Sequence, residues 1–120
     1  MSGVGLSLIN ENKNMEEVTG KQRLERLYER LKKNYPNEDI RFEDETLIIG
    51  KYKLVKFKVA YYINGRQMCD AVWGDGSYGF KENLLEFYNW DEPIGNITEH
   101  KAYKFFEACI ETERRVEANK

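Results

Sequence analysis

The 120-residue sequence has little of what metal centres, disulfide scaffolds and most active sites are built from. It contains two cysteines, Cys69 and Cys109, and one histidine, His100. The cysteines have no C-x-x-C spacing and are fewer than a small secreted domain usually carries, so we expect two buried thiols in a reducing compartment. His100 has no acidic partner that spacing implies, apart from the adjacent Glu99. We therefore expect no metal ion, no cofactor and no catalytic residue, and hence a protein that is not an enzyme.

Long apolar runs and an overall charge are also missing. No stretch approaches the ~20 apolar residues that a membrane-spanning helix needs. The N-terminus lacks the basic segment and apolar run of a signal peptide. The net charge is −2, so no overall field attracts the chain to nucleic acid or to an anionic membrane. These absences predict a cytoplasmic protein, the cytoplasm of an infected host cell included, without membrane association.

What the sequence does contain is enough apolar material for one core. Hydrophobic residues make up 41% and aromatic residues 13% of the chain, which is typical of a folded domain. Residues 1–14 combine glycines and asparagines with a weak alternation of Val4, Leu6 and Leu8. We expect a mobile leader over residues 1–14 and a single domain over residues 15–120.

Apolar periodicity predicts a helix at each end of this domain, with strands between them. The first helix, over about residues 16–35, has one apolar stripe and ends at Pro36; the second begins after Thr98, a good N-cap, and runs to about residue 117. Strands are expected near 40–42 and over 46–49, 53–63, 67–73 and 84–88, although the last of these is ambiguous with a helical turn. Residues 43–45 should form a turn and residues 89–96 a connection. This order predicts an α+β fold in which an antiparallel sheet of four to five strands packs against an N-terminal and a C-terminal helix.

Asn64-Gly65 is the strongest hairpin signal in the chain. A two-residue loop there predicts the pairs Ile63–Arg66, Tyr61–Met68, Val59–Asp70 and Phe57–Val72. The face toward the helices should then carry Val55, Phe57, Val59, Tyr61, Ile63, Met68 and Val72. The outward face should carry Lys56, Lys58, Ala60, Tyr62, Gln67, Cys69, Ala71 and Trp73. Asp70 is an anomaly on the apolar face, where it would sit at a rim or accept hydrogen bonds from a loop.

Charge is segregated along the chain although its total is small. Residues 21–33 hold six basic and two acidic side chains, and residues 51–66 hold five basic and no acidic ones. Residues 67–100 hold one basic and seven acidic side chains, and residues 37–45 hold one and five. Opposite faces of this kind favour steered association with a charged partner. The same runs also serve simply to solvate exposed faces and to protect edge strands.

The outward face of the hairpin is the candidate contact surface. Its residues are Lys56, Lys58, Tyr62 and Trp73, with Lys51 and Lys53 nearby. Such a face can anchor a protein through its aromatic residues, or stack bases and neutralise phosphates, or simply represent cross-strand pairing on a half-exposed sheet. Of the two binding modes we favour protein. An alternative acidic surface, which could occupy a site meant for nucleic acid, consists of Glu82, Glu86, Asp91 and Glu92.

Three short motifs carry a resemblance to known proteins. They are Gly76-Ser77-Tyr78-Gly79, Leu84-Leu85-Glu86 and Ile94-Gly95-Asn96-Ile97-Thr98. This pattern resembles one in small uncharacterised proteins of bacteriophages and mobile elements, over residues 67 to about 112. The sequence departs from it at Phe80, where a second glycine is common, and at Ile97, where leucine is. The resemblance implies a fold and a phage-like origin and supplies no catalytic residue.

Together these features predict a non-catalytic phage or mobile-element accessory protein that binds another protein, one of the bacterial host. The sharpest version is an inhibitor of a bacterial defence system, in the manner of an anti-CRISPR protein, or of a host enzyme. The alternative is a nucleic-acid-binding module that uses the basic hairpin, and an enzyme of unknown type is a third reading. The chain is expected as a monomer or as a homodimer through an edge strand or the Trp73 face.

Overall fold

The computed structural model describes residues 18–120. The leader expected over residues 1–14 lies outside the described residues. Among those described, no helix is both long and apolar enough to cross a membrane.

Two capped helices bound the described chain, as predicted, although the first begins at Gly20, later than the predicted start near residue 16. Helix α2 (Gly20–Asn34) begins with a capping box, in which Gln22 N donates to Thr19 Oγ1 over 3.1 Å and Thr19 N donates to Gln22 Oε1 over 2.9 Å. Its last residue is Asn34, and Tyr35 is the C-cap that precedes Pro36. Helix α3 (Glu99–Ala118) has Thr98 as its N-cap. Local capping chemistry therefore sets the start of both helices.

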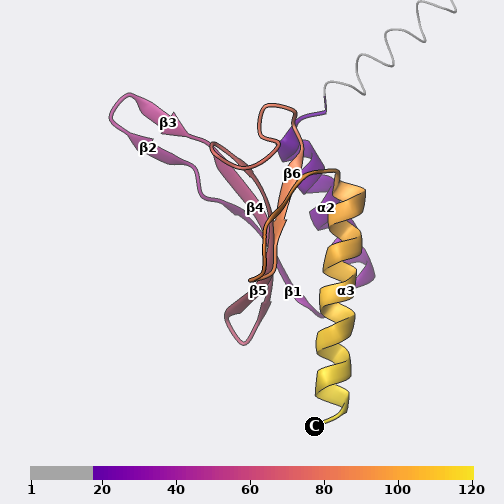
Figure 1. The fold of residues 1–120 in the computed structure, drawn as a ribbon. Coiled ribbons are helices and arrows are strands. Elements are labelled where there is room, and N and C mark those ends of the chain that lie inside the picture. Colours follow the sequence, from indigo (N-terminus) through magenta and orange to yellow (C-terminus); the bar gives the residue numbers. More distant parts are fainter. Residues whose placement is uncertain (1–17) are drawn as a thin grey trace, which may run out of the picture.

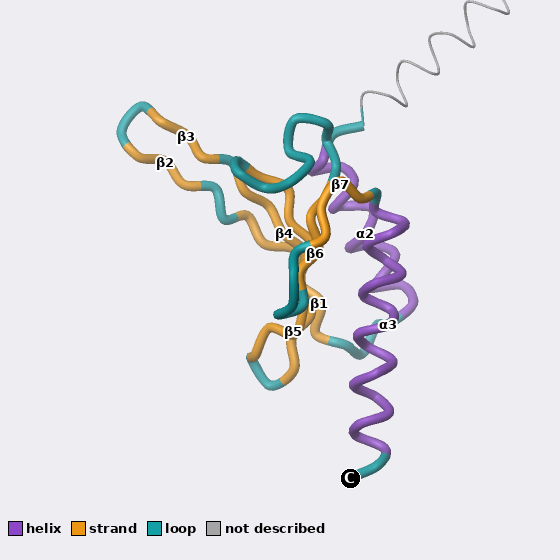
Figure 2. The backbone as a smooth tube through the Cα atoms, in the orientation of Figure 1, coloured by secondary structure: helices purple, strands orange, loops and turns teal. Residues whose placement is uncertain are grey.

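The strands form an antiparallel sheet and a separate hairpin. The sheet has the order β1-β4-β5-β6-β7. Its strands are β1 (Asp39–Asp44), β4 (Lys56–Ile63), β5 (Arg66–Gly74), β6 (Leu85–Tyr88) and β7 (Ile94–Ile97). The hairpin consists of β2 (Leu47–Ile49) and β3 (Tyr52–Leu54), which pair only with each other. Both helices cover the same face of the sheet, and the other face stays open (Figures 1 and 2). The predicted α+β fold is confirmed.

The core lies between the sheet and the two helices. Helix α2 contributes Leu24, Leu27 and Leu31, and helix α3 contributes Ala102, Phe106 and Ile110, all at most 1% exposed. The strands supply Val59, Tyr61, Cys69, Ala71, Leu85 and Phe87. Removal of these apolar surfaces from water stabilises the two-layer arrangement.

Three strand boundaries differ from those predicted. The strand expected over 53–63 is divided at Val55, whose N–H donates to Asp75 Oδ2 over 2.6 Å instead of continuing the sheet. Glu43 and Asp44, expected in a turn, belong to β1 and pair with Lys58 and Phe57. Strand β7 begins inside the expected connection of residues 89–96 and ends at Ile97. Its pairing with β6 is irregular, and an irregular edge strand leaves no clear alternation in the sequence.

The register of the β4–β5 hairpin also differs. The Ile63–Arg66 pair is confirmed, but a β-bulge follows, and Tyr61 pairs with Cys69, Val59 with Ala71 and Phe57 with Trp73. The other predicted pairs are wrong because one extra residue in a strand shifts the register, and every later side chain of that strand then lies on the opposite face of the sheet. Cys69, Ala71 and Trp73 consequently lie on the helix side, and Asp70 and Val72 lie on the open side. The bulge thereby removes the anomaly of an aspartate among the apolar residues.

Candidate functional site

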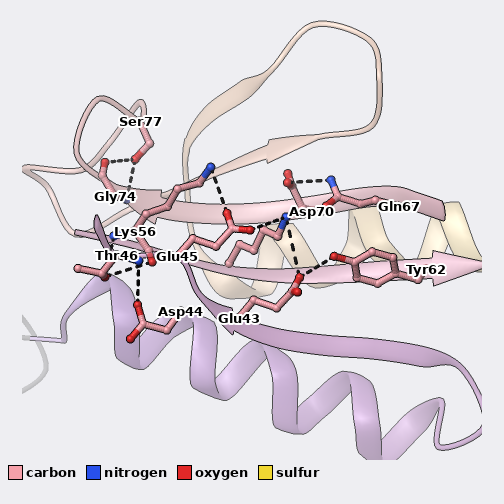
Figure 3. A network of polar contacts seen from close by, with 11 residues as sticks. Glu43, Asp44, Glu45, Thr46, Lys56, Tyr62, Gln67, Asp70, Gly74 and Ser77 are labelled. Atoms are coloured by element: carbon pink, nitrogen blue, oxygen red, sulfur yellow. Dashed lines mark hydrogen bonds and ion pairs between the residues drawn. The ribbon is translucent and has the colours of Figure 1, made fainter. Parts of the chain in front are cut away.

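The open face of the sheet carries a network of ion pairs (Figure 3). Lys58 Nζ lies 3.2 Å from Glu45 Oε2 and 3.9 Å from Glu43 Oε1, and it donates to Gln67 Oε1 over 2.9 Å. Its side chain is only 12% exposed. Lys56 Nζ lies 3.3 Å from Glu45 Oε1. Two of the predicted contact lysines are therefore matched by carboxylates of their own chain.

Tyr62 and Glu45 belong to the same network. The Tyr62 hydroxyl donates to Glu43 Oε1 over 2.6 Å, and the Arg41 guanidinium lies 4.0 Å from the centre of the Tyr62 ring. Burial and the bond to Glu43 raise the pKa of Tyr62 to about 12. Burial acts to raise the pKa of Glu45, but the bonds from the two lysines outweigh it and hold that pKa below its ordinary value. Glu45 is thus charged at neutral pH, and each of its carboxylate oxygens faces a lysine of the same network.

Asp70 is the exception in this network. It is 9% exposed, and its Oδ2 accepts a hydrogen bond from Gln67 Nε2 over 2.9 Å. Its Oδ1 is buried and has no partner among the described residues. Burial therefore raises the pKa of Asp70, against the pull of the bond from Gln67 and of Lys58. The carboxylate is a destabilising element at the centre of the sheet.

Trp73 lies on the helix side of the sheet, away from the predicted contact lysines. Its ring stacks on Phe57 at a centroid distance of 6.4 Å and lies 4.8 Å from Phe80, whose carbonyl accepts from its Nε1 over 3.0 Å. A Cβ at Gly20 would come within 2.1 Å of the same ring. Trp73 therefore joins helix α2 to the sheet, and the structure does not bring it together with Lys56, Lys58 and Tyr62.

The four acidic candidates are also dispersed. Glu86, on β6, accepts from the Tyr78 backbone N–H over 2.7 Å. Glu82 lies in the loop before β6 and lines a different hollow. Only Asp91 and Glu92 share one hollow, in the connection between β6 and β7. The predicted acidic surface is thus divided among three places.

Lys51 and Lys53 lie on a structure of their own, which we call the arm (residues 46–55). It consists of strands β2 and β3 and projects beyond the sheet (Figures 1 and 2). The pairs Leu47–Leu54 and Ile49–Tyr52 point to one side of this ribbon, because directly opposed residues share a face. The exposed fractions of these four residues are 58% for Leu47, 58% for Ile49, 65% for Tyr52 and 44% for Leu54. Within residues 18–120, one whole face of the arm is therefore apolar and uncovered.

Among the described residues, hydrogen bonds hold the arm at its base, and its two strands pair only with each other. Val55 N donates to Asp75 Oδ2 over 2.6 Å, and Asp75 N donates back to Val55 O over 2.8 Å. Lys56 N donates to Thr46 Oγ1 over 3.2 Å, and Thr46 N donates to Asp44 Oδ1 over 2.9 Å. The direction in which the arm leaves the sheet is set by these bonds.

A hollow with an apolar floor lies between helix α3 and the ends of β5, β6 and β7; we call it the groove. It has a volume of about 460 Å³. Its lining is Met68, Phe87, Asn89, Trp90, Asp91, Glu92, Ile94, Phe105, Ala108, Cys109, Thr112 and Glu113. Trp90 is 63% exposed and donates from Nε1 to Gln67 O over 2.9 Å, so its ring is held at the edge. The groove combines apolar and acidic side chains and has no basic one.

The thiols and the histidine do not form a catalytic pair. Cys69 and Cys109 are free and hydrogen-bonded to each other. That bond, with burial, raises the pKa of Cys69, and the same bond lowers the pKa of Cys109. His100 Nδ1 lies 3.1 Å from Arg30 Nη1, a cation rather than a carboxylate. Within residues 18–120 no three His, Cys, Asp or Glu side chains gather as metal ligands.

Sequence reasoning missed the arm and the groove. Residues 46–49 were assigned to a strand closed by Gly50, and residue 53 onward to a separate long strand. Gly50, at φ +60° between two apolar runs, was the available signal for a second hairpin. Trp90 and Ile94 were assigned to a connection, and only the tertiary structure brings them beside Phe105 of α3.

Comparison with known proteins assigns no family to the chain. No family model, no curated protein and no solved structure matches it. The fold and its surfaces define an α+β protein with a projecting apolar arm and an acidic groove. Its function must be inferred from these two features.

Proposed function

We propose that the chain is a non-catalytic protein that acts by binding another protein, and that the arm is its contact element. The observation that carries this proposal is the uncovered apolar face of Leu47, Ile49, Tyr52 and Leu54. Contiguous exposed apolar patches of this kind mark interaction sites.

The physical state of the arm supports the proposal. A two-stranded hairpin alone is only marginally stable in water, and it normally gains stability from packing against another element. Within residues 18–120, the strands of the arm pair only with each other. Tyr52 provides an aromatic anchor of the kind that dominates protein interfaces, and Lys51 and Lys53 provide charge that steers association.

The arm is better suited to this role than the open sheet face. Lys56 and Lys58 are paired with Glu43 and Glu45, so neither offers an unmatched charge to a partner. The alternative of a nucleic-acid-binding module depends on free lysines on that face, and it stays a prediction without further support.

The resemblance to phage and mobile-element proteins supports a narrower proposal about the biological setting. In that setting the bound protein belongs to the bacterial host, and binding inhibits a defence system or a host enzyme. The narrower proposal rests on the sequence motifs of residues 67–112, whereas the arm supports only protein contact.

The experiment is photo-crosslinking from the arm. A benzoylphenylalanine replaces Tyr52 in the full chain, which is produced in bacterial cells and irradiated there. The matched control carries the same replacement at Tyr78, which is 62% exposed against 65% for Tyr52. We expect a discrete protein adduct from position 52 and none of the same mass from position 78, with each adduct identified by mass spectrometry.

A second variant links the adduct to the apolar face. Ile49→Ser and Leu54→Ser, added to the position-52 probe, should abolish the adduct, whereas Val116→Ser on α3 should leave it unchanged. Absence of any adduct from position 52, or equal adducts from both positions, would contradict the role of the arm.

A further inference from the structure

We propose that the arm binds a second copy of this chain, and that each arm of a two-fold dimer occupies the groove of the other subunit. This inference rests on the proposed function, because it requires the arm to be a protein contact. It adds the identity of the partner and the place where the arm docks.

The groove carries the negative charge that the arm lacks. Its floor is apolar, with Phe87 at 2% exposure and Ile94 at 41%. Three carboxylates, those of Asp91, Glu92 and Glu113, stand among its lining residues, and no lysine or arginine does. The groove therefore fits an apolar segment that carries positive charge.

The arm has the complementary composition. Residues 46–55 include two lysines and no acidic residue. Lys51 lies in the two-residue turn at the tip, and Lys53 lies opposite Ile48 on the face away from the four apolar residues. An arm that lays its apolar face on the groove floor turns Lys53 away from that floor, so Lys51 at the tip is the lysine placed to reach a rim carboxylate. Such complementarity favours this pairing over other apolar contacts.

The arm cannot enter the groove of its own chain. It leaves the sheet where Lys56 pairs with Gly74, whereas the groove begins at Met68, near the opposite end of β5. Six residues of extended strand, roughly 20 Å, separate these two ends. Figure 1 shows the arm pointing away from the sheet on this side. An arm that occupies the groove must therefore come from another molecule.

A reciprocal arrangement closes the assembly. Because arm and groove lie at opposite ends of the sheet, two copies related by a two-fold axis place each arm beside the other's groove. Two arm–groove contacts then form at once, which doubles the buried area. A one-way contact repeated along a row of copies would instead give an open filament.

The experiment uses two charge-reversal variants of the full chain. The arm variant carries Lys51→Glu and Lys53→Glu, and the groove variant carries Asp91→Lys and Glu92→Lys. All four residues are exposed and make no hydrogen bond that holds the described fold, so both variants should keep the circular dichroism of the wild type. Matched controls reverse other exposed charges: Lys101→Glu with Lys104→Glu on α3, and Glu25→Lys with Glu29→Lys on α2.

Light scattering over a dilution series gives the mass of each species. We expect a dimer for the wild type and for both controls. Each charge variant alone should dissociate with a Kd raised at least about tenfold, because like charges face each other in both contacts. An equimolar mixture of the arm variant and the groove variant should form a heterodimer of near wild-type affinity, since both contacts then pair opposite charges. The four substitutions combined in one chain should also restore the homodimer.

Three results would overturn this inference. A wild-type chain that is monomeric at every concentration has no self-contact. A dimer that both charge variants retain must form elsewhere, as through the β7 edge. A series of growing masses indicates an open filament rather than a closed dimer.

Crosslinking from position 52 separates failure of this inference from failure of the proposed function. An adduct to a different protein, found together with a monomeric chain, overturns the dimer and leaves the arm as a protein contact. No adduct at all contradicts both proposals.

Discussion

The two hairpins of this protein have similar local chemistry and opposite surroundings. Both close with a two-residue turn that contains a glycine, Asn64-Gly65 between β4 and β5 and Gly50-Lys51 between β2 and β3. In each hairpin one strand, β3 or β4, alternates apolar side chains with lysines. The β4–β5 hairpin is covered by the helices on one face, and its lysines are paired with carboxylates on the other. In the part of the chain that the structure describes, nothing covers the apolar face of the arm, and its lysines form no ion pair with a carboxylate.

The comparison teaches that burial, rather than sequence pattern, separates a structural hairpin from a contact hairpin. In β4, Tyr61 is 1% exposed, whereas Tyr52 of β3 is 65% exposed. The same residue type therefore contributes core stability in one place and an available interface in the other. Four substitutions test this difference, and they follow from the largest expected effect to the smallest.

Tyr61→Ala should cause the largest loss. It removes a fully buried aromatic side chain, and the free energy of unfolding should fall by about 3 kcal/mol or more, as is typical when buried aromatic residues are truncated. Urea denaturation followed by circular dichroism measures this change. Tyr61→Phe keeps the ring and should cost much less. A loss under about 1 kcal/mol for the alanine variant would mean that β4 is not packed as described.

Gly20→Ala tests the helix that covers the structural hairpin. The added Cβ would lie 2.1 Å from the Trp73 ring, so the ring or the helix must move, at a cost of about 1–3 kcal/mol. Helix propensity alone predicts the opposite sign, since alanine is favoured over glycine by about 1 kcal/mol. Urea denaturation gives the sign of the change in the free energy of unfolding. Trp73 fluorescence, measured with Trp90→Phe in both proteins, reports whether the ring has moved. A stabilised variant would contradict the close contact.

Asp70→Asn tests the uncompensated carboxylate of the structural hairpin. Burial raises the pKa of Asp70 in the folded state, so the folded protein holds this proton more tightly than the unfolded chain. The contribution of Asp70 to stability therefore falls as pH rises from roughly 3.9, the ordinary aspartate pKa, through the folded pKa. Asparagine does not ionise, and the variant should be more stable than the wild type at pH 7 by on the order of 1 kcal/mol.

Denaturation across the acidic range measures the Asp70 effect. The advantage of the asparagine variant should shrink as pH falls through the folded pKa of Asp70 and vanish below the ordinary aspartate pKa. Asp91→Asn, at an exposed position, is the control and should show no such trend. A difference between variant and wild type that is constant with pH would exclude ionisation of Asp70 as its cause.

Tyr52→Ala on the arm should have the smallest effect. In the background of Asp91→Lys with Glu92→Lys, where arm docking is opposed, the free energy of unfolding should change by less than about 0.5 kcal/mol. The same denaturation assay compares it directly with Tyr61→Ala. A loss near that of Tyr61→Ala would show that the arm packs on its own chain, and the contrast between the two hairpins would disappear.

Much of the fold was predictable because its signals are local. Thr19 and Thr98 begin the helices, Pro36 follows the end of the first, and Asn64-Gly65 closes the central hairpin. The register was not predictable, because the bulge beside Tyr61 has no local signature. One unpaired residue moved Trp73 and Asp70 to opposite faces from those expected. Of the predicted contact residues, Lys51 and Lys53 lie on the arm, whereas Lys56 and Lys58 lie in an ion-pair network that depends on β1.

The sequence by itself determined the class of fold and the order of its elements. Capping groups, turn residues and apolar periodicity act over a few neighbouring positions, so their effect can be recognised from the sequence alone. Only the tertiary structure decided which apolar face is left uncovered and which charges are already paired. Burial and ion pairing depend on residues distant in the chain: the two helices cover one hairpin, whereas no described residue covers the apolar face of the other.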